Sequence, residues 1–329
     1  MIEPRRAVVT GVTGCVGQAL VPALARHGWT VRGLVRSVHA SAPPPLEELH
    51  IGDLADPASL RGLCHGADLV IHAGGLVGDW GPRDTFWRIN RDGTRALLEE
   101  AVRAGVDRFI YVGTANVFGF RTDIVVDELT PKSRSPFPYP QSKLDTEKLV
   151  WSYRDTGIGI TVVYPTWVFG PGDRHLVPEM VERLRRRQLV YLGRAAVPLE
   201  VTYSENLAEA IVLTAQNAAA RGEGYIVGDG FGRTLAGFIE DLATAADLHP
   251  PRFSVPLPVA YGLALASERL ATATRSRTRP LLTRYAVRSL ATGVRFDLRK
   301  IRSLGYEPKI GLAEGLRRAV ASLDGESAG

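Results

Sequence analysis

Cysteine is scarce in this sequence, with only Cys15 and Cys64 among 329 residues. Two cysteines do not provide a disulfide framework, so we expect a protein of the reducing cytoplasm. The apolar runs, such as residues 257–266, fall well short of the roughly 20 residues that a membrane-spanning helix needs. The chain passes from Met1 directly into a strand-like segment, without the regions of a secretory signal. These absences predict a cytoplasmic protein with no membrane span.

Metal-binding patterns and a dominant charge are also missing. The seven histidines and two cysteines show no metal-ligand spacing, so we expect no metal. The 40 Lys and Arg residues against 35 Asp and Glu give a formal net charge of only +5. The densest basic run, Arg183 with residues 185–187, has a helical pattern and no aromatic neighbours. A solvent-exposed helix face explains this run better than a nucleic-acid site, and a weak preference for anionic ligands stays open.

The first half of the chain alternates short β-branched runs with helical patterns. This alternation is typical of an α/β fold of the Rossmann type, a parallel sheet wound by crossover helices. The predicted strands are residues 7–10, 30–35, 50–52, 69–72, 108–112 and 160–164, and the predicted helices are residues 16–27, 57–63, 84–104 and 142–156.

The alternation of strand and helix patterns becomes less regular after residue 172. Helical patterns over residues 176–187 and 206–215 mix with isolated strands such as residues 224–228. We therefore predict a Rossmann domain over residues 1–172 and a smaller lobe over residues 173–329, with some segments returning to the main sheet. Ligands of doubly wound sheets bind beyond the carboxyl ends of the strands, so the smaller lobe is expected to form the substrate pocket there.

A glycine-rich turn follows the first predicted strand, with three glycines spaced G-x-x-G-x-x-G before a helix. In a dinucleotide site the first glycine permits the tight turn, the second lets the backbone approach the pyrophosphate, and the third allows close helix–sheet packing. The helix N-terminus adds amide donors and positive potential. A plain turn is the alternative, but the position at the first βα turn favours the cofactor. The predicted contacts in this turn are Gly11, Thr13, Gly14, Cys15, Val16 and Gly17, with Cys15 in a packing role rather than as a nucleophile.

The end of the second predicted strand has arginine instead of a carboxylate. An acidic residue there accepts from the ribose 2′-hydroxyl, whereas arginine meets the 2′-phosphate of NADP. Arg36 is therefore the candidate phosphate contact and Arg32 a weaker second, which favours NADP and leaves NAD open; a solvent-exposed arginine is the alternative. Asp53 and Leu54, after the third strand, are placed to contact the adenine, although Asp53 could simply cap the next helix.

A phenol and an ammonium lie four residues apart, at Tyr139 and Lys143, near the start of a helix and hence on one face. A phenol with a pKa near 10 is a poor acid or base at neutral pH, and a nearby cation is expected to lower that pKa. Lys143 can also bind the nicotinamide ribose. An exposed helical pair is the alternative, but Thr114 at the end of the fifth strand supplies a hydroxyl that can bind a substrate carbonyl beside Tyr139.

Taken in order along the chain, the glycine-rich turn, Asp53 with Leu54, Thr114 and the Tyr139–Lys143 pair resemble the extended short-chain dehydrogenase/reductase superfamily. The resemblance spans essentially the whole chain. Three further segments are similar to superfamily motifs: His72-Ala73-Gly74-Gly75 to its strand-four cofactor motif, Asn90-Arg91-Asp92-Gly93-Thr94 to its N-x-x-G-T, and Pro165-Thr166-Trp167-Val168-Phe169-Gly170-Pro171-Gly172-Asp173 to the segment that covers the nicotinamide. The resemblance implies cofactor contacts from Ala73, Gly74, Gly75, Pro165 and Val168, besides Tyr139 and Lys143. It gives His72 no catalytic role, so we expect it only to end a buried strand.

Three segments, residues 77–90, 172–178 and 279–308, are similar to the 3β-hydroxysteroid dehydrogenase-like branch and to 2-alkyl-3-oxoalkanoate reductases. The likeness implies alcohol or ketone chemistry on a large apolar substrate, and a homodimer. Thr114 stands where the branch usually has serine and keeps the hydroxyl, whereas Phe118 replaces a tyrosine and Gly74 an alanine. Five aromatic residues could line an apolar pocket, of which one or two are expected to touch substrate: Trp80, Trp87, Trp167, Phe231 and Tyr261. The predicted substrate contacts are Trp80, Thr114, Asn116, Trp167 and Arg174.

The sequence thus predicts an NADP-dependent oxidoreductase acting on a bulky hydroxy or keto compound such as a 3-keto acid, a sterol or a polyketide. Two alternatives stay open. Nucleotide-sugar epimerases and dehydratases use the same three catalytic residues, and Arg174 could then bind a diphosphate. A cofactor-binding protein whose chemistry has lapsed is the other, which intact Thr114, Tyr139 and Lys143 disfavour.

Overall fold

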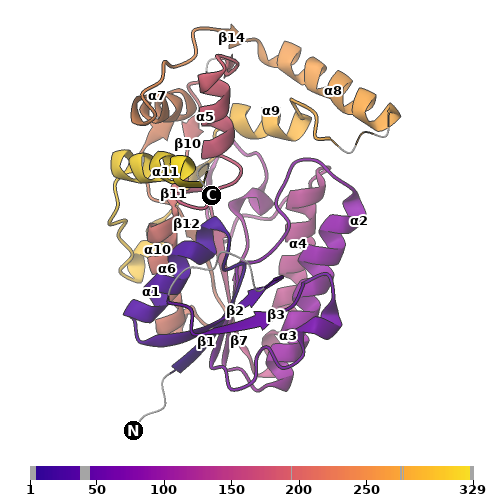
Figure 1. The fold of residues 1–329 in the computed structure, drawn as a ribbon, viewed down its shortest axis with the longest axis vertical. Helices are drawn as coiled ribbons and strands as arrows, with labels where there is room; N and C mark the ends of the chain where they lie inside the picture. The colour runs from indigo at the N-terminus through magenta and orange to yellow at the C-terminus, as the bar shows by residue number, and fades with distance from the viewer. Residues whose placement is uncertain (1–4, 38–44, 194, 275, 277, 327–329) are drawn as a thin grey trace.

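The computed structural model describes residues 5–37, 45–193, 195–274, 276 and 278–326. Within these ranges, seven strands form one parallel sheet (Figure 1). Across the sheet they are β3 (Glu48–Ile51), β2 (Trp29–Val35), β1 (Arg5–Thr10), β4 (Leu69–His72), β5 (Arg108–Val112), β7 (Gly159–Pro165) and β12 (Gly224–Val227). The order reverses between β1 and β4, as in a doubly wound sheet. The predicted Rossmann-type α/β fold is confirmed.

Helices cover both faces of this sheet (Figure 1). Helices α1 (Cys15–Arg26) and α6 (Ser204–Gln216) pack together on one face, while α3 (Gly93–Arg103) and α4 (Pro138–Trp151) pack on the other. With both faces covered, the central strands are mostly apolar instead of alternating with polar residues. Every residue of β4 and of β5 is buried.

The structure departs from the predicted helices in three places. The helix expected over residues 84–104 is α2 (Arg83–Phe86), a π-helical segment η2 (Trp87–Asp92) and α3 in succession. Helix α4 begins at Pro138 rather than at residue 142, because proline suits a first turn whose amides have no helical acceptors. Residues 57–63 form only the short 3-10 helix η1 (Pro57–Leu60), which a left-handed Gly62 follows.

The C-terminal half builds a second apolar core above the carboxyl edge of the sheet (Figure 1). Its helices α5 (Val177–Arg185), α7 (Leu235–Ala245) and α11 (Leu312–Glu326) pack on one another, and an arm of α8 (Leu257–Ala273) and α9 (Arg284–Ala291) extends beside them. The remaining elements are η3 (Ala115–Phe118), η4 (Arg154–Thr156), η5 (Ala218–Ala220), α10 (Arg299–Ser303) and the paired short strands β6 (Val125–Val126) with β15 (Arg295–Phe296), β8 (Trp167–Phe169) with β11 (Val201–Tyr203), β9 (Tyr191–Leu192) with β14 (Ser254–Val255), and β10 (Pro198–Leu199) with β13 (Arg233–Thr234).

Parts of the C-terminal half belong spatially to the main sheet. Strand β12 forms its outer edge beside β7, and α6 packs on α1. The predicted division of the chain at residue 172 stays a prediction. No helix in the described ranges has both the length and the apolar character that spanning a bilayer requires.

A buried arginine fastens α6 to the sheet. Arg108, the first residue of β5, donates to the carbonyl oxygens of Thr214, Ala215 and Asn217 at distances of 2.7–3.0 Å. These carbonyls end α6, where the helix dipole is negative, so the guanidinium both satisfies them and offsets that dipole. The side chain is 8% exposed.

Replacing this arginine tests the anchor. Arg108→Met leaves three buried carbonyls without their donor, so the free energy of unfolding should fall by about 2–4 kcal/mol in urea titrations. The exposed Arg61 provides the control, because Arg61→Met should change it by only about 0.5 kcal/mol or less. Equal effects from the two substitutions would show that Arg108 anchors nothing.

Candidate active site

The glycine-rich turn allows backbone segments to lie unusually close to one another. Gly11 has a φ of +75°, and a Cβ on it would lie 2.8 Å from the Gly74 backbone at the end of β4. A Cβ on Gly17 would collide with the backbone of Gly11 and Val12. Only glycine fits these positions, so the turn brings the N-terminus of α1 against the carboxyl edge of β1 and β4. The amides of that helix end then form a cradle that fits a dinucleotide pyrophosphate.

A buried chain of hydrogen bonds runs from this turn across the sheet. The Gly74 amide donates to Thr10 Oγ1 over 3.0 Å, and Thr10 Oγ1 lies 2.7 Å from His72 Nδ1. On the other side of the ring, His72 Nε2 lies 2.7 Å from Thr94 Oγ1, which itself donates to the Asn90 carbonyl. Because the Thr94 hydroxyl donates its proton to that carbonyl, it can only accept a hydrogen bond from His72. The His72 ring therefore donates from Nε2 and accepts at Nδ1. Burial, and secondarily the charge of Lys143, lowers the pKa of His72 to about 3, which keeps it neutral.

The π-helical segment η2 carries the chain onward to the catalytic helix. Its wide turn points the Asn90 side chain inward, where the amide donates to Ser142 Oγ over 3.0 Å and to the Leu76 carbonyl over 3.0 Å. Asn90 Oδ1 accepts from the Leu76 amide, and Ser142 Oγ donates to the Tyr139 carbonyl. The first turn of α4 is thereby tied to the loop that follows β4.

Thr114, Tyr139 and Lys143 come together at the carboxyl end of β5. Thr114 caps η3, and its hydroxyl, which accepts from the Asn116 amide over 3.3 Å, lies close enough to the Tyr139 phenol to lower the pKa of that phenol. Lys143 is buried, donates from Nζ to the Val112 carbonyl over 2.9 Å and lies 4.4 Å from the centre of the Tyr111 ring. The three residues predicted to be catalytic thus form one cluster at the edge where doubly wound sheets bind ligands.

The electrostatics of this cluster differ from the sequence expectation. Burial raises the pKa of Tyr139 to about 12, and the contact with Thr114 lowers it only in part. Burial also lowers the pKa of Lys143 to about 7, against the attraction of Glu147 one turn along α4. Burial therefore keeps the Tyr139 phenol protonated at neutral pH, and it leaves Lys143 partly neutral near pH 7. The cluster therefore holds a protonated phenol ready to donate.

The other predicted cofactor contacts occupy the same edge. Asp53 and Leu54 follow β3, and Leu54 packs where a side chain on Gly93 would collide with it. Asp56, not Asp53, caps η1, while Asp53 Oδ1 accepts from the Ala55 amide over 2.8 Å. Ala73, Gly74 and Gly75 follow β4, and Pro165 and Val168 lie at the end of β7 and in β8. Burial raises the pKa of the Cys15 thiol well above its usual value, in line with a packing role.

The two arginines of β2 lie in different surroundings. Arg36 is exposed just after the strand ends. Arg32 is buried, pairs with Glu48 over 2.9 Å and donates to the Leu63 and His65 carbonyls. The donors of the Arg32 guanidinium are therefore already used within the protein. Arg36 stays the candidate contact for a 2′-phosphate.

On the substrate side, the structure adds a residue that sequence reasoning missed. Tyr285 of α9 reaches the site, where its hydroxyl accepts from Asn116 Nδ2 over 2.9 Å and its ring meets that of Phe137 at 5.1 Å. Burial, and next the nearby Tyr139, raises the pKa of Tyr285 far above its usual value. Because 169 positions separate Tyr285 from Asn116, no local pattern could have paired them.

The predicted substrate residues are otherwise dispersed. Trp80 is half-buried in the loop after β4, Trp167 is half-buried in β8, and Arg174 is exposed. Trp87 donates to Asp145 over 3.1 Å on the α2–α4 side, and Tyr261 lies exposed on α8. Phe231 packs against the second apolar core.

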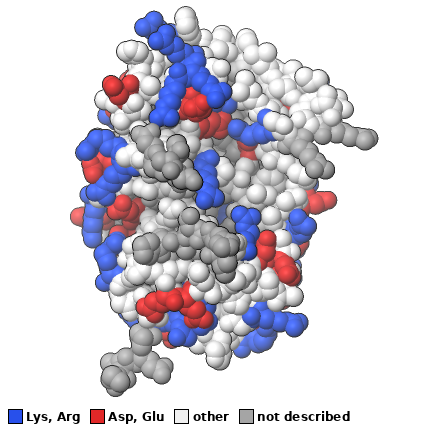
Figure 2. Space-filling view, in the orientation of Figure 1, with Lys and Arg blue, Asp and Glu red and all other residues white. Residues whose placement is uncertain are grey.

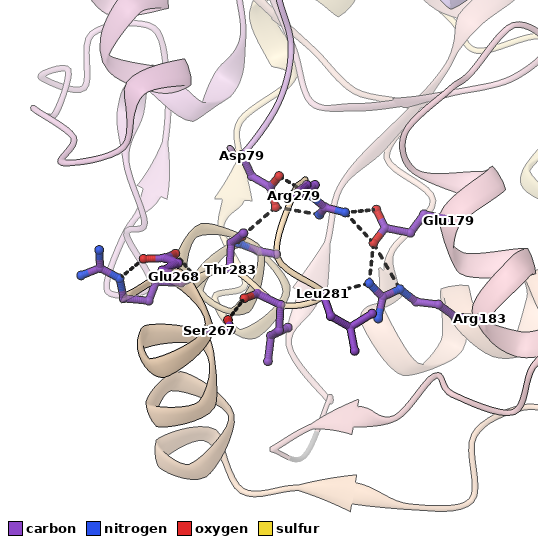
Figure 3. A network of polar contacts seen from close by, with 11 residues as sticks. Asp79, Glu179, Arg183, Ser267, Glu268, Arg279, Leu281 and Thr283 are labelled. Carbon is purple, nitrogen blue, oxygen red and sulfur yellow. Dashed lines mark hydrogen bonds and ion pairs between the residues drawn. The ribbon is translucent and has the colours of Figure 1, made fainter. Parts of the chain in front are cut away.

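An ion-pair network holds the α8–α9 arm over this region (Figure 3). Arg279 lies between Asp79 and Glu179, at 2.5 Å and 3.0 Å, and Thr283 donates to Asp79 over 2.6 Å. Burial alone would raise the pKa of Asp79, but its bonds with Arg279 and Thr283 outweigh that and hold it below the usual value. Thr283 also caps α9, so the network sets where α9 starts and hence where Tyr285 points.

Residues 7–228 match the model of the NAD dependent epimerase/dehydratase family. This chain belongs to that family. The superfamily predicted from the sequence, the extended short-chain dehydrogenases/reductases, is thereby confirmed, and NAD(P) binding is expected of a family member.

Similar proteins cover the chain from end to end. A 2-alkyl-3-oxoalkanoate reductase of Stenotrophomonas maltophilia (strain K279a) is 30% identical over 96% of this chain and 99% of its own. A decarboxylating sterol-4-alpha-carboxylate 3-dehydrogenase of Mus musculus is 26% identical over 98% and 91%. Among solved structures, UDP-glucose 4-epimerase from Thermotoga maritima with UDP-glucose has a TM-score of 0.77 at 20% identity, over 98% of this chain and 99% of that chain, which shows a shared fold alone.

The lowered pKa of Lys143 makes stability depend on pH. Between pH 7 and 10.5 the unfolded chain binds more protons at this residue than the folded protein does. The contribution of Lys143 to the free energy of unfolding should therefore rise with pH across that window, by at most about 1.4 kcal/mol per unit. Urea unfolding of wild type and Lys143→Met at pH 7, 8 and 9, without cofactor, checks this. Parallel pH profiles for the two proteins would contradict the assignment.

Proposed function

We propose that this protein is an NADP-dependent ketone reductase, or alcohol dehydrogenase in reverse, acting on a bulky and largely apolar hydroxy or keto compound. The observation that carries the proposal is the cluster of Thr114, Tyr139 and Lys143 beside the glycine cradle. A bound nicotinamide cofactor supplies or accepts the hydride. The chain's own residues must then orient the carbonyl and move the proton.

Each catalytic side chain has a task that its environment supports. Thr114 and Tyr139 present two hydroxyls, close to each other, to a single carbonyl oxygen. In reduction, the Tyr139 phenol gives its proton to that oxygen, and the high pKa of Tyr139 ensures that the proton is present at neutral pH. When Lys143 is charged, its ammonium stabilises the phenolate that remains, and Glu147 favours that charged form against the effect of burial. The Val112 carbonyl oxygen accepts a hydrogen bond from Lys143 Nζ and so fixes the position of that amino group.

The relatives' names narrow the substrate class that we propose. In a 2-alkyl-3-oxoalkanoate the ketone carbon is bonded to the carbon that carries the carboxylate, and in a sterol 4-alpha-carboxylate the carboxylate is on carbon 4, next to carbon 3. Both are apolar molecules with a β-oxygenated carboxylate. Around the cluster, the Phe120, Phe137 and Tyr285 rings add an apolar wall, and the Tyr285–Asn116 pair adds a second polar position. We therefore propose a substituted 3-keto acid or a related ketone as substrate.

Removing the phenolic hydroxyl tests the function. Tyr139→Phe should lower kcat by about 10²–10⁴-fold while cofactor affinity changes little, because the ring remains and only the proton donor is lost. A panel of 3-keto acids, sterols and aryl ketones with NADPH and NADH provides the assay. Tyr153→Phe is the matched control and should keep full activity, because Tyr153 lies just beyond the C-terminal end of α4, whereas Tyr139 lies at its N-terminal end. Full activity of Tyr139→Phe would remove Tyr139 from the mechanism.

The same assay separates the alternatives. Net consumption of NADPH excludes an epimerase, because epimerisation regenerates its cofactor. Cofactor binding without turnover of any ketone would favour a protein whose chemistry has lapsed.

Arg36 tests the cofactor preference. Arg36→Glu removes the cation for a 2′-phosphate and adds a carboxylate that repels it but can accept from a ribose 2′-hydroxyl. The ratio of kcat/KM with NADPH to that with NADH should fall at least about tenfold. Arg154→Glu is the matched control, because Arg154 is exposed in η4, just before β7, and three strands separate β7 from β2 in the sheet. An unchanged ratio in Arg36→Glu would contradict the NADP assignment.

A further inference from the structure

Helix α8 buries its small apolar side chains and exposes its large ones, which is the reverse of the usual arrangement. The residues that it buries against α9 and β9 are small, with Ala260 and Ala264 almost fully covered. Its large side chains face solvent: Leu263 is 59% exposed and Leu270 is 66% exposed. Val259, Leu263, Ala266 and Leu270, here called the α8 stripe, recur at helical spacing and are all exposed. A surface helix normally buries such a stripe, so the α8 stripe is a candidate contact surface.

The exposed apolar side chains are concentrated here. Seven of the thirteen large hydrophobic side chains exposed in the described ranges lie between residues 253 and 281: Phe253, Leu257, Val259, Tyr261, Leu263, Leu270 and Leu281. The surface over α8, at the upper right of Figure 2, is almost free of charged side chains. Scattered exposed hydrophobics need no explanation, but a contiguous set on one helix and its flanks does.

The segment that carries α8 and α9 is basic in sequence. Residues 248–296 contain eight arginines and a single acidic residue, Glu268. Glu268 is buried and pairs with Arg284 over 2.6 Å, so it adds no negative charge to the surface. Arg252 and Arg269 are exposed and have no ion-pair partner in the described ranges. An apolar stripe flanked by arginines is complementary to a surface with an apolar interior and anionic groups above it.

The arm that carries the stripe is fixed next to the active site. Its segment between α8 and α9 is clamped by Arg279 to Asp79 and Glu179 (Figure 3), and α9 sends Tyr285 to Asn116. A surface bound through α8 would therefore lie beside the region where Thr114 and Tyr139 act.

We propose that α8 docks this protein onto the surface of an anionic phospholipid bilayer. The α8 stripe enters the boundary between head groups and acyl chains, while Arg252 and Arg269 meet the lipid phosphates. The contact lies in the membrane plane, since α8 is 17 residues long and buries one side on the protein. A second copy of the chain is the weaker occupant, because a two-fold contact through this stripe would bring the arginines of both copies together.

Vesicle co-sedimentation tests the proposal without any need for turnover, so its outcome is independent of the proposed function. Wild type should bind vesicles of phosphatidylcholine with 30% phosphatidylglycerol at least about tenfold more tightly than vesicles of phosphatidylcholine alone. Raising the salt from about 0.1 M to 0.5 M should weaken the binding to the anionic vesicles, because screening acts on the arginines.

The variants place the contact on α8. Leu263→Glu should reduce the partition coefficient on anionic vesicles at least about tenfold, with an unchanged melting temperature, because the side chain is already exposed. Leu129→Glu is the matched control: this leucine is 89% exposed elsewhere and its substitution adds the same charge, so binding should be kept to within about twofold.

Three results would overturn the proposal. The first is no binding of wild type to anionic vesicles. The second is equal binding by wild type and Leu263→Glu, and the third is an equal loss in Leu263→Glu and Leu129→Glu. Sizing chromatography in which Leu263→Glu converts a dimer to a monomer, with no vesicle binding by wild type, would assign the α8 stripe to a second copy instead.

Discussion

The hydrogen-bond chain through the buried His72 ring connects the glycine-rich turn on one side of the sheet with helix α4 on the other. It passes from Gly74 and Thr10 through the imidazole to Thr94 and Asn90, and from there to the first turn of α4. Each member uses its proton in one direction only, so the chain has a single arrangement while His72 is neutral. The cofactor cradle and the catalytic phenol are therefore positioned by the same polar network, inside an otherwise apolar core.

The catalytic cluster takes its electrostatics from that core. Lys143 and Tyr139 are both driven toward their neutral forms, because burial removes the water that would solvate either charge. Glu147, which also accepts from Tyr164 over 2.7 Å, is the nearby carboxylate that favours a charged lysine. In the proposed function, the charge states of Tyr139 and Lys143 thus depend on burial and on Glu147.

The C-terminal half completes the site from above. Its arm is attached by Arg279 to two elements that are about 100 and 200 positions away in the sequence, and it delivers Tyr285 to Asn116. The same arm exposes the α8 stripe on its outer side. The proposed apolar substrate and the proposed membrane-surface contact are thus consistent with one placement of this arm.

The sequence by itself determined most of the local elements and the residues of the candidate catalytic cluster. The strands over residues 69–72 and 108–112 were predicted with the bounds that the structure shows, because buried parallel strands are unbroken apolar runs that end at polar or glycine residues. Gly11, Gly14, Gly17, Tyr139 and Lys143 follow from spacing and a recognisable order. Only the tertiary structure decided the π-helical turn that directs Asn90 inward, the bond of Lys143 to the Val112 carbonyl, the burial that keeps Tyr139 protonated, and the contact of Tyr285 with Asn116. These features depend on the close approach of segments far apart in the chain and on the loss of water between them, and neither is encoded in any local pattern of residues.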